Sequence, residues 1–196
     1  MEQIERRQIV EGLQIEDRGE GKEKGITGLG IVFNKRSVNL GGFVEIIKPE
    51  AVRDIDWTDV VSMVNHDSNR TVGRNPDTLS IKVEKNGVRY TIEPSELSYY
   101  RDLSISVSRG DIKGSSFGFM VETDGEDWTE DESGLVVRTI TKFRKIYDIS
   151  PVVFPAYPDT TAAKRSLDAY MEAKKPKNTY PIGLARRKFE VLKIKK

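Results

Sequence analysis

The chain contains one histidine, His66, and a serine pair, Ser115-Ser116, that could be combined into catalytic chemistry. Histidine can act as a general base near neutral pH, and a serine hydroxyl is a poor nucleophile unless such a base removes its proton. The chain holds no second histidine and no cysteine. This composition excludes a multi-histidine metal site, a thiolate metal site and a cysteine nucleophile within one chain. A serine hydrolase is one chemistry that these residues leave possible.

His66 follows the apolar run Val60–Val64, where the sequence changes to polar residues. A residue at the end of a strand is held by a rigid scaffold, and site residues commonly lie at such positions. On the pattern alone, an ordinary strand-end histidine bonded to a turn is the more common explanation. If a histidine is the general base, however, it must be this one.

Ser116 lies in the segment GSSFGF, within a strand that we predict over residues 111–121. Successive side chains of a strand point to opposite faces, so Ser115 shares a face with the two phenylalanines, and Ser116 shares the other with Gly118. The aromatic face is the expected core, and Gly118 leaves space beside the second hydroxyl, which favours Ser116 as the nucleophile. The glycines would also let the backbone approach closely, as an oxyanion-binding site requires. A strand with small residues for packing explains the same pattern, and the glycine spacing is not that of a G-x-S-x-G elbow.

Asp148 is an acid within the apolar run 146–154, where strand alternation places it on one face with Ile146 and Ser150. As the third member of a triad it would hold the tautomer of the imidazole and stabilise the imidazolium. An acid on the surface of a strand is an equal alternative. The spacing of these residues along the chain says nothing about whether the fold brings them together.

The elements that must position these residues are mostly strands, so we predict a mainly β protein with helices, of the α+β class. Asn86-Gly87 between two apolar runs predicts a β-hairpin, and residues 122–132 are acidic and predict a solvated loop. A helix is expected to begin within 93–109 before a strand at 103–107. The other expected strands are 25–34 (with a bulge or tight bend), 43–47, 60–64, 78–83, 88–92, 135–143 and 146–154, and the other expected helices are 50–53 and 162–173.

The net charge of +1 is divided unevenly along the chain. Residues 164–196 hold eleven Lys or Arg and three acidic residues, a net charge of +8, whereas the remainder has a net charge of −7. We therefore predict a domain over 1–163 and a basic C-terminal helix and tail over 164–196. Such a tail can dock on an acidic partner or on nucleic acid, or it can be a solvated extension. It has few aromatics and no recognised binding motif, so nucleic acid is not an expected partner.

Other classes of site are not indicated. No phosphate-binding loop, H-E-x-x-H sequence or EF-hand loop is present, so no cofactor and no metal are expected. No apolar run reaches the length of about 20 residues that a membrane span needs, and the first residues lack the apolar core of a secretion signal. We expect a soluble, intracellular protein with no membrane partner.

Five short segments, in order, resemble the caudovirus prohead protease family, which is related in fold to the herpesvirus maturation protease, assemblin. They are GITGLGIVFNKRS, GGFVEIIKPEAV, VVSMVNHDSNRTVGR, DIKGSSFGF and FRKIYDISPVVFPAYPDT. The third resembles the histidine motif of the family and identifies His66 as the base. The fourth resembles the serine motif and identifies Ser116 as the nucleophile. In the fifth, an acid precedes a hydrophobic–serine pair; this acid is often glutamate in the family, whereas here it is Asp148, which has a shorter side chain.

The resemblance implies a β-barrel core ringed by helices and a serine endopeptidase with His66, Ser116 and Asp148 as its triad. It also implies cleavage of scaffold or major capsid protein extensions during procapsid maturation, followed by self-cleavage. The implied partners are the phage capsid and scaffold proteins and a second copy of the chain. The implied location is inside the procapsid, in the cytoplasm of an infected or lysogenic bacterium. The alternative is a catalytically inactive capsid-assembly or scaffold protein of the same fold. Backbone amides or a cation (Arg138, Arg144 or Lys145) would stabilise the oxyanion.

Overall fold

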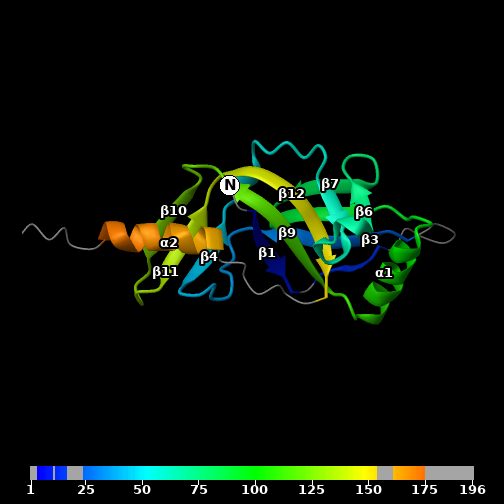
Figure 1. Cartoon of the computed structure of the whole chain (residues 1–196), viewed down its shortest axis with the longest axis horizontal. Coiled ribbons are helices and arrows are strands. Elements are labelled where there is room, and N and C mark those ends of the chain that lie inside the picture. The colour runs from blue at the N-terminus through cyan, green and yellow to red at the C-terminus, as the bar shows by residue number, and fades with distance from the viewer. Residues whose placement is uncertain (1–3, 11, 17–23, 154–160, 175–196) are drawn as a thin grey trace, which may run out of the picture.

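The structure is a computed structural model that describes residues 4–10, 12–16, 24–153 and 161–174. Figure 1 shows an elongated molecule with the largest sheet in the middle and one α-helix at each end. The α-helices are α1 (Ser98–Arg109) and α2 (Thr161–Lys174). The strands are β1 (Glu5–Ile9), β2 (Gln14–Ile15), β3 (Ile26–Val32), β4 (Phe43–Ile47), β5 (Val61–Met63), β6 (Thr71–Arg74), β7 (Leu79–Glu84), β8 (Gly87–Ile92), β9 (Gly114–Val121), β10 (Glu126–Glu130), β11 (Val136–Ile140) and β12 (Phe143–Val152). Short 3-10 helices are η1 (Pro49–Val52), η2 (Val64–His66) and η3 (Ser68–Arg70).

The central sheet has the strand order β1-β9-β12-β5-β6. Strand β9 lies between β1 and β12 and is antiparallel to both. Strand β12 also runs parallel to β5, with Asp148 opposite Val61. This order brings the serine segment, the acidic segment and the strand before the histidine side by side, although they are far apart in the sequence.

A second sheet, with the order β2-β3-β8-β7, packs on one face of the central sheet. The approach is close at Gly28 and Gly30 of β3. A Cβ atom at Gly30 would lie 2.4 Å from the side chain of Ile149, and one at Gly28 would lie 3.0 Å from the Oγ of Ser115. Glycine is therefore required at Gly30 for the two sheets to make this contact. The core between the sheets includes the fully buried side chains of Ile26, Tyr90, Phe117, Phe119 and Ile149.

A third, smaller sheet has the order β10-β11-β4 and is covered by α2 (Figure 1). Buried Ala163, together with Leu167 and Tyr170 of α2, packs on Phe43 and Trp128 of this sheet. The predicted domain boundary at 163/164 falls within α2, and the boundary stays a prediction. Residues 175–196 of the predicted tail lie outside the described residues.

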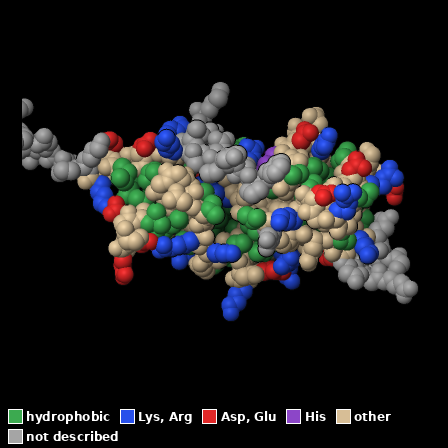
Figure 2. All heavy atoms as spheres, turned by 90° about the horizontal axis from the view of Figure 1, so that it is seen from below, with side chains coloured by type: hydrophobic (Ala, Val, Ile, Leu, Met, Phe, Trp, Pro, Cys, Tyr) green, Lys and Arg blue, Asp and Glu red, His purple; other side chains and the backbone are tan. Residues whose placement is uncertain are grey.

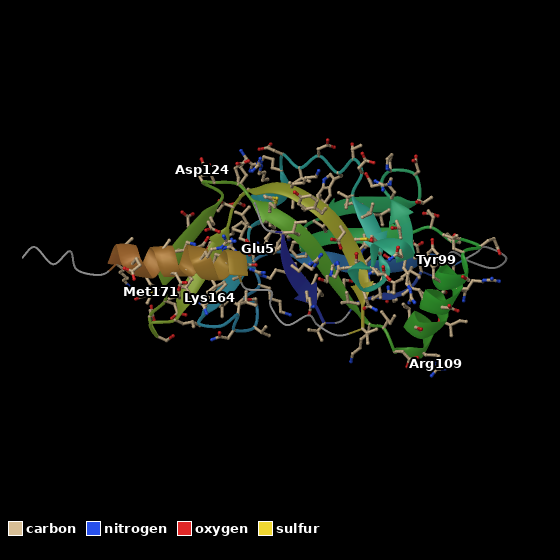
Figure 3. All side chains as sticks on the ribbon, in the orientation of Figure 1. Glu5, Tyr99, Arg109, Asp124, Lys164 and Met171 are labelled. Atoms are coloured by element: carbon tan, nitrogen blue, oxygen red, sulfur yellow. The ribbon has the colours of Figure 1, made fainter. Side chains whose placement is uncertain are left out.

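A group of five charged side chains, four of them buried and one half-buried, joins the third sheet to β1. We call it the charge cluster; it consists of Glu5, Arg7, Glu45, Glu126 and Arg138. Figure 3 shows Glu5 at the junction between the central sheet and the part that carries α2. The two arginines contact Glu5 and Glu45 at 2.7–2.9 Å, and Arg138 also pairs with Glu126. The cluster therefore fixes β1 to two other strands, β4 and β11.

Most of the predicted elements are confirmed. The hairpin at Asn86-Gly87 joins β7 to β8, and β3 has its bulge between Leu29 and Ile31. The predicted helix over 162–173 is α2. The α+β class is confirmed as well.

Three expectations about local structure were wrong or incomplete. The segment 103–107 is not a strand but part of α1, because Leu103 and Val107 are four residues apart and share the buried face of the helix. The acidic loop at 122–132 contains β10, in which exposed Asp127 and Thr129 alternate with half-buried Glu126 and Trp128. Strand β1 was not expected at all, because its sequence ERRQI is mostly charged.

The expected closed barrel ringed by helices is not found. The pairings among the described strands form three sheets, and β1 and β6 are the edges of the central one. The described residues contain two α-helices, at opposite ends of the molecule (Figure 1), and these do not surround the sheets. A core like that of the herpesvirus protease stays a prediction.

Neither of the described helices is long and apolar enough to cross a membrane. On the face that Figure 2 shows, basic and acidic side chains are interspersed among apolar ones.

Candidate active site

The two adjacent serines of β9 point to opposite faces of the central sheet. The hydroxyl of Ser115 lies in the core, 2.9 Å from the phenolic oxygen of Tyr90. Burial raises the pKa of Tyr90, so the phenol stays neutral beside it. Ser116 is on the other face, as the alternation of the segment predicted, and its hydroxyl meets the histidine instead.

His66 lies at the end of η2, in a backbone conformation that is uncommon for residues other than glycine. Asn65 and His66 have φ angles of 53° and 58°, both in the left-handed region. Such a conformation costs of order 1–3 kcal/mol for each non-glycine residue and is found most often at functional sites. The side chain of Asn65 accepts a hydrogen bond of 2.9 Å from the backbone N–H of Val153, just past the end of β12. This contact ties the strained turn to the strand that carries the acid.

Ser116, His66 and Asp148 form a continuous hydrogen-bonded series. The Nε2 atom of His66 is 2.8 Å from the Oγ of Ser116, and its Nδ1 atom is 2.6 Å from the Oδ2 of Asp148. An ionised carboxylate can only accept hydrogen bonds, so it favours the tautomer with a proton on Nδ1. The lone pair of Nε2 then faces the serine hydroxyl and can accept its proton. All three sequence-predicted site residues are therefore brought together.

The carboxylate of Asp148 is buried and held by more than the histidine. The hydroxyl of Ser150 donates to its Oδ2 at 2.6 Å and accepts the backbone N–H of Met63 at 3.2 Å. Strand β5 is thereby tied to the acid on β12. These two contacts hold the carboxylate of Asp148 in the orientation in which it meets the imidazole.

Gly118 has a different role from the one expected. Gly118 and Asp148 lie opposite each other on β9 and β12, and a Cβ atom at position 118 would lie 2.5 Å from the Oδ1 of Asp148. The space beside Ser116 on this strand is therefore occupied by the carboxylate. The glycine makes room for the acid, whereas the sequence suggested that it left open ground for a substrate.

Three buried polar atoms have no partner among the described residues, and two of them belong to β1, beside the strand of Ser116. The Nε of Arg6, the Nε2 of Gln8 and the Oγ of Ser62 are buried and find no hydrogen-bond partner among the described residues. Arg6 and Gln8 belong to β1, opposite Gly118 and Ser116 respectively. Ser116 itself is fully buried.

The sequence suggested three cations for an oxyanion site, and the structure places them in different surroundings. Arg138 is 1% exposed and bound to three glutamates in the charge cluster. Lys145 lies over the ring of Tyr147, 5.0 Å from its centroid, and Arg144 is exposed on β12. Arg138 is thus excluded, because every nitrogen of its guanidinium is already engaged.

Four residues around the series were not singled out as site residues: Arg6, Gln8, Asn65 and Ser150. Ser150 had a signal, because alternation placed it on the face of Asp148. Arg6 and Gln8 had none, because the partner of β1 is set by the order of the sheet and not by any local pattern. Within the described residues, no group of three or more His, Asp or Glu side chains could hold a metal ion.

A serine hydroxyl, an imidazole and a buried carboxylate in series can carry out acyl transfer, which is the chemistry of the serine hydrolases. The family model of the caudovirus prohead serine protease matches residues 11–173. The chain belongs to this family and is a protease of phage capsid maturation, as its motifs suggested.

One solved structure is similar in outline. The capsid assembly protease gp21 of bacteriophage T4 is 11% identical in sequence and has a TM-score of 0.44, and the match covers 78% of this chain and 98% of that chain. No curated protein sequence matches the chain.

Proposed function

We propose that the chain is a serine endopeptidase that removes extensions from scaffold and major capsid proteins inside the procapsid, and that also cleaves itself. Ser116 is the nucleophile, His66 the general base and acid, and Asp148 the group that orients the imidazole. The observation that carries this proposal is the hydrogen-bonded series from Ser116 through His66 to Asp148, with distances of 2.8 and 2.6 Å.

The acylation step follows from these contacts. As the Oγ of Ser116 bonds to the scissile carbonyl carbon, its proton passes to the Nε2 of His66, and the carbonyl electron pair moves onto oxygen. When that pair returns, the C–N bond breaks, and the leaving amine takes the proton from Nε2. Water then attacks the acyl-enzyme with His66 as its base, which releases the new carboxyl end and restores the serine hydroxyl.

The strained turn and the buried acid support these roles over ordinary packing. A histidine that only capped a strand would not require a left-handed backbone at its own position. A surface strand acid would not be 3% exposed and shared between an imidazole and a serine hydroxyl. Membership of the prohead protease family supports the proposed substrates and location.

The decisive experiment is co-expression of the chain with the major capsid protein encoded beside it, followed by intact mass measurement of both proteins. The wild type is compared with Ser116→Ala and with Ser115→Ala, an adjacent variant whose hydroxyl faces the core. Truncation of the capsid protein or of the chain is expected with the wild type and with Ser115→Ala, but not with Ser116→Ala. Thermal melting confirms that each variant is folded.

The inactive-scaffold alternative makes the opposite prediction. A scaffold of the same fold would leave the capsid protein and the chain untruncated in all three samples. Its Ser116 would not react with a fluorophosphonate probe. Truncation that persists in Ser116→Ala would remove this serine as the nucleophile.

A further inference from the structure

The two faces of β1 are bonded very differently. Glu5 and Arg7 point into the charge cluster, where their charged groups are paired. Arg6 and Gln8 point the other way, toward the face of β9 that carries Ser116, and the Nε2 of Gln8 is buried without a partner in the described part of the chain. One face holds the strand in place, and the other presents donors to the nucleophile.

The nucleophile strand itself has few donors to offer. In many serine hydrolases, backbone N–H groups beside the nucleophile stabilise the oxyanion. Here β9 lies between two antiparallel neighbours, β1 and β12, along most of its length. The N–H groups of such a strand are used in the ladders on its two sides. A donor for the oxyanion near Ser116 must therefore come from a side chain or from another segment.

Gln8 has the right position for this task. It lies directly opposite Ser116 in the β1–β9 ladder, and opposite side chains in an antiparallel pair share a face with their Cβ atoms about 4.5–5.5 Å apart. Its side chain is long enough for the amide to reach past the hydroxyl. A buried amide N–H without a partner is costly and rare in native proteins, and such a cost is understandable where a substrate supplies the missing acceptor.

We propose that Gln8 is the oxyanion donor: its side-chain amide N–H donates a hydrogen bond to the carbonyl oxygen of the scissile bond. The carbonyl oxygen gains an electron pair as the Oγ of Ser116 bonds to carbon, and Gln8 stabilises this charge without giving up its proton. When the pair returns and the C–N bond breaks, the same hydrogen bond weakens again. This inference rests on the proposed role of Ser116 as the nucleophile.

Strand β1 is anchored in the sheet, so Gln8 is held at a fixed position beside Ser116. Displacing β1 from the sheet would pull Glu5 and Arg7 out of the charge cluster and leave Arg138 without one of its partners. The strand therefore stays in place while Ser116 reacts. The Nε2 of Gln8 can turn toward an entering carbonyl without breaking any hydrogen bond that it makes in the described structure.

The test is the rate at which a fluorophosphonate labels Ser116. When the Oγ of Ser116 bonds to phosphorus, its proton passes to His66 and fluoride leaves, and the phosphoryl oxygen takes the place of the carbonyl oxygen. We would compare the wild type with Gln8→Met, which is similar in size but has no donor, and with Gln8→Glu, whose carboxylate has no donor and repels an oxyanion. Gln14→Met is the matched control, because Gln14 is exposed on β2.

We expect Gln8→Met to lower the labelling rate constant about 10²-fold, as the loss of one oxyanion donor does, and Gln8→Glu to lower it at least as much. The melting temperature of Gln8→Met should stay the same or rise, because an unpaired buried donor has been removed. Gln14→Met should label at the wild-type rate. Labelling of Gln8→Met at the wild-type rate would overturn the role of Gln8 and leave that of Ser116 intact.

Two further outcomes are also decisive. A fall in labelling together with a lower melting temperature would assign Gln8 a structural role and overturn the proposal. If the wild type is not labelled, or if Ser116→Ala is labelled equally, both the proposed function and the role of Gln8 fail.

Discussion

The molecule contains two buried polar networks, and the difference between them separates structure from function. In the charge cluster, two arginines and three glutamates pair with one another, and no member is an unpaired buried group in the described structure. The site series of Ser116, His66 and Asp148 is continuous too, but it has unpaired donors beside it and a strained turn within it. Complete pairing is what a network needs in order to hold strands together, because a partly satisfied buried network is costly. The groups left without partners indicate where a substrate is expected.

The largest expected effect belongs to the site series. Asp148→Asn should lower the rate of capsid protein cleavage about 10⁴-fold, because the amide favours the wrong tautomer of the imidazole. The melting temperature should change little, since the amide keeps the size of the carboxyl group. Cleavage is followed by intact mass over time, with Asp127→Asn, an exposed position on β10, as the matched control. A loss of activity smaller than tenfold would mean that Asp148 does not orient His66.

The charge cluster should respond in the opposite way, through stability. Arg138→Met should lower the free energy of unfolding by about 3–5 kcal/mol, because it leaves Glu5, Glu45 and Glu126 buried without their shared partner. Urea denaturation measures the change. The matched control is Arg36→Met, which removes an exposed ion pair with Asp131 and should hardly move the midpoint. Equal midpoints for the two variants would show that the cluster does not hold the third sheet to β1.

The sequence predicted the residues Ser116, His66 and Asp148, but it did not predict strand β1, which lies beside them. Ser116 and Asp148 could be placed on their faces because strand alternation is a local rule. The choice of Ser116 over Ser115 followed from the two phenylalanines, which the structure places in the core. That His66 meets both residues depends on the strand order β9-β12-β5, which no local pattern contains; the resemblance to the family supplied that information.

The failures have a common physical cause. Strand β1 and strand β10 are rich in charge, so they lack the apolar alternation by which strands are recognised. Three of these charged side chains are paired with residues of other strands: Glu5 and Glu126 meet Arg138, and Arg7 meets Glu45. Pairing of this kind arises only in the folded chain. The sequence therefore predicted a solvated loop at β10 and no element at β1, and Gln8 was missed with β1.

The smallest expected effect is the change of the urea midpoint at low pH. It tests whether the ion pairs of Glu5 in the charge cluster contribute to stability. Burial by itself would raise the pKa of Glu5, but the hydrogen bonds and charges of Arg138 and Arg7 outweigh it and lower the pKa below the usual 4.5. A carboxyl group whose pKa is lower in the folded state stabilises the fold at a pH above its unfolded pKa, and this contribution is lost as the pH falls through the folded value. Urea midpoints should therefore fall as the pH is lowered from about 4.5. Glu5→Gln, which cannot titrate, should start from a lower midpoint at neutral pH and should lose less of it on acidification. If both proteins lose the same amount between pH 5 and pH 3, Glu5 is not the acid-sensitive member of the cluster. The contribution of Glu5 to stability would then come from its packing and not from its ion pairs with the two arginines.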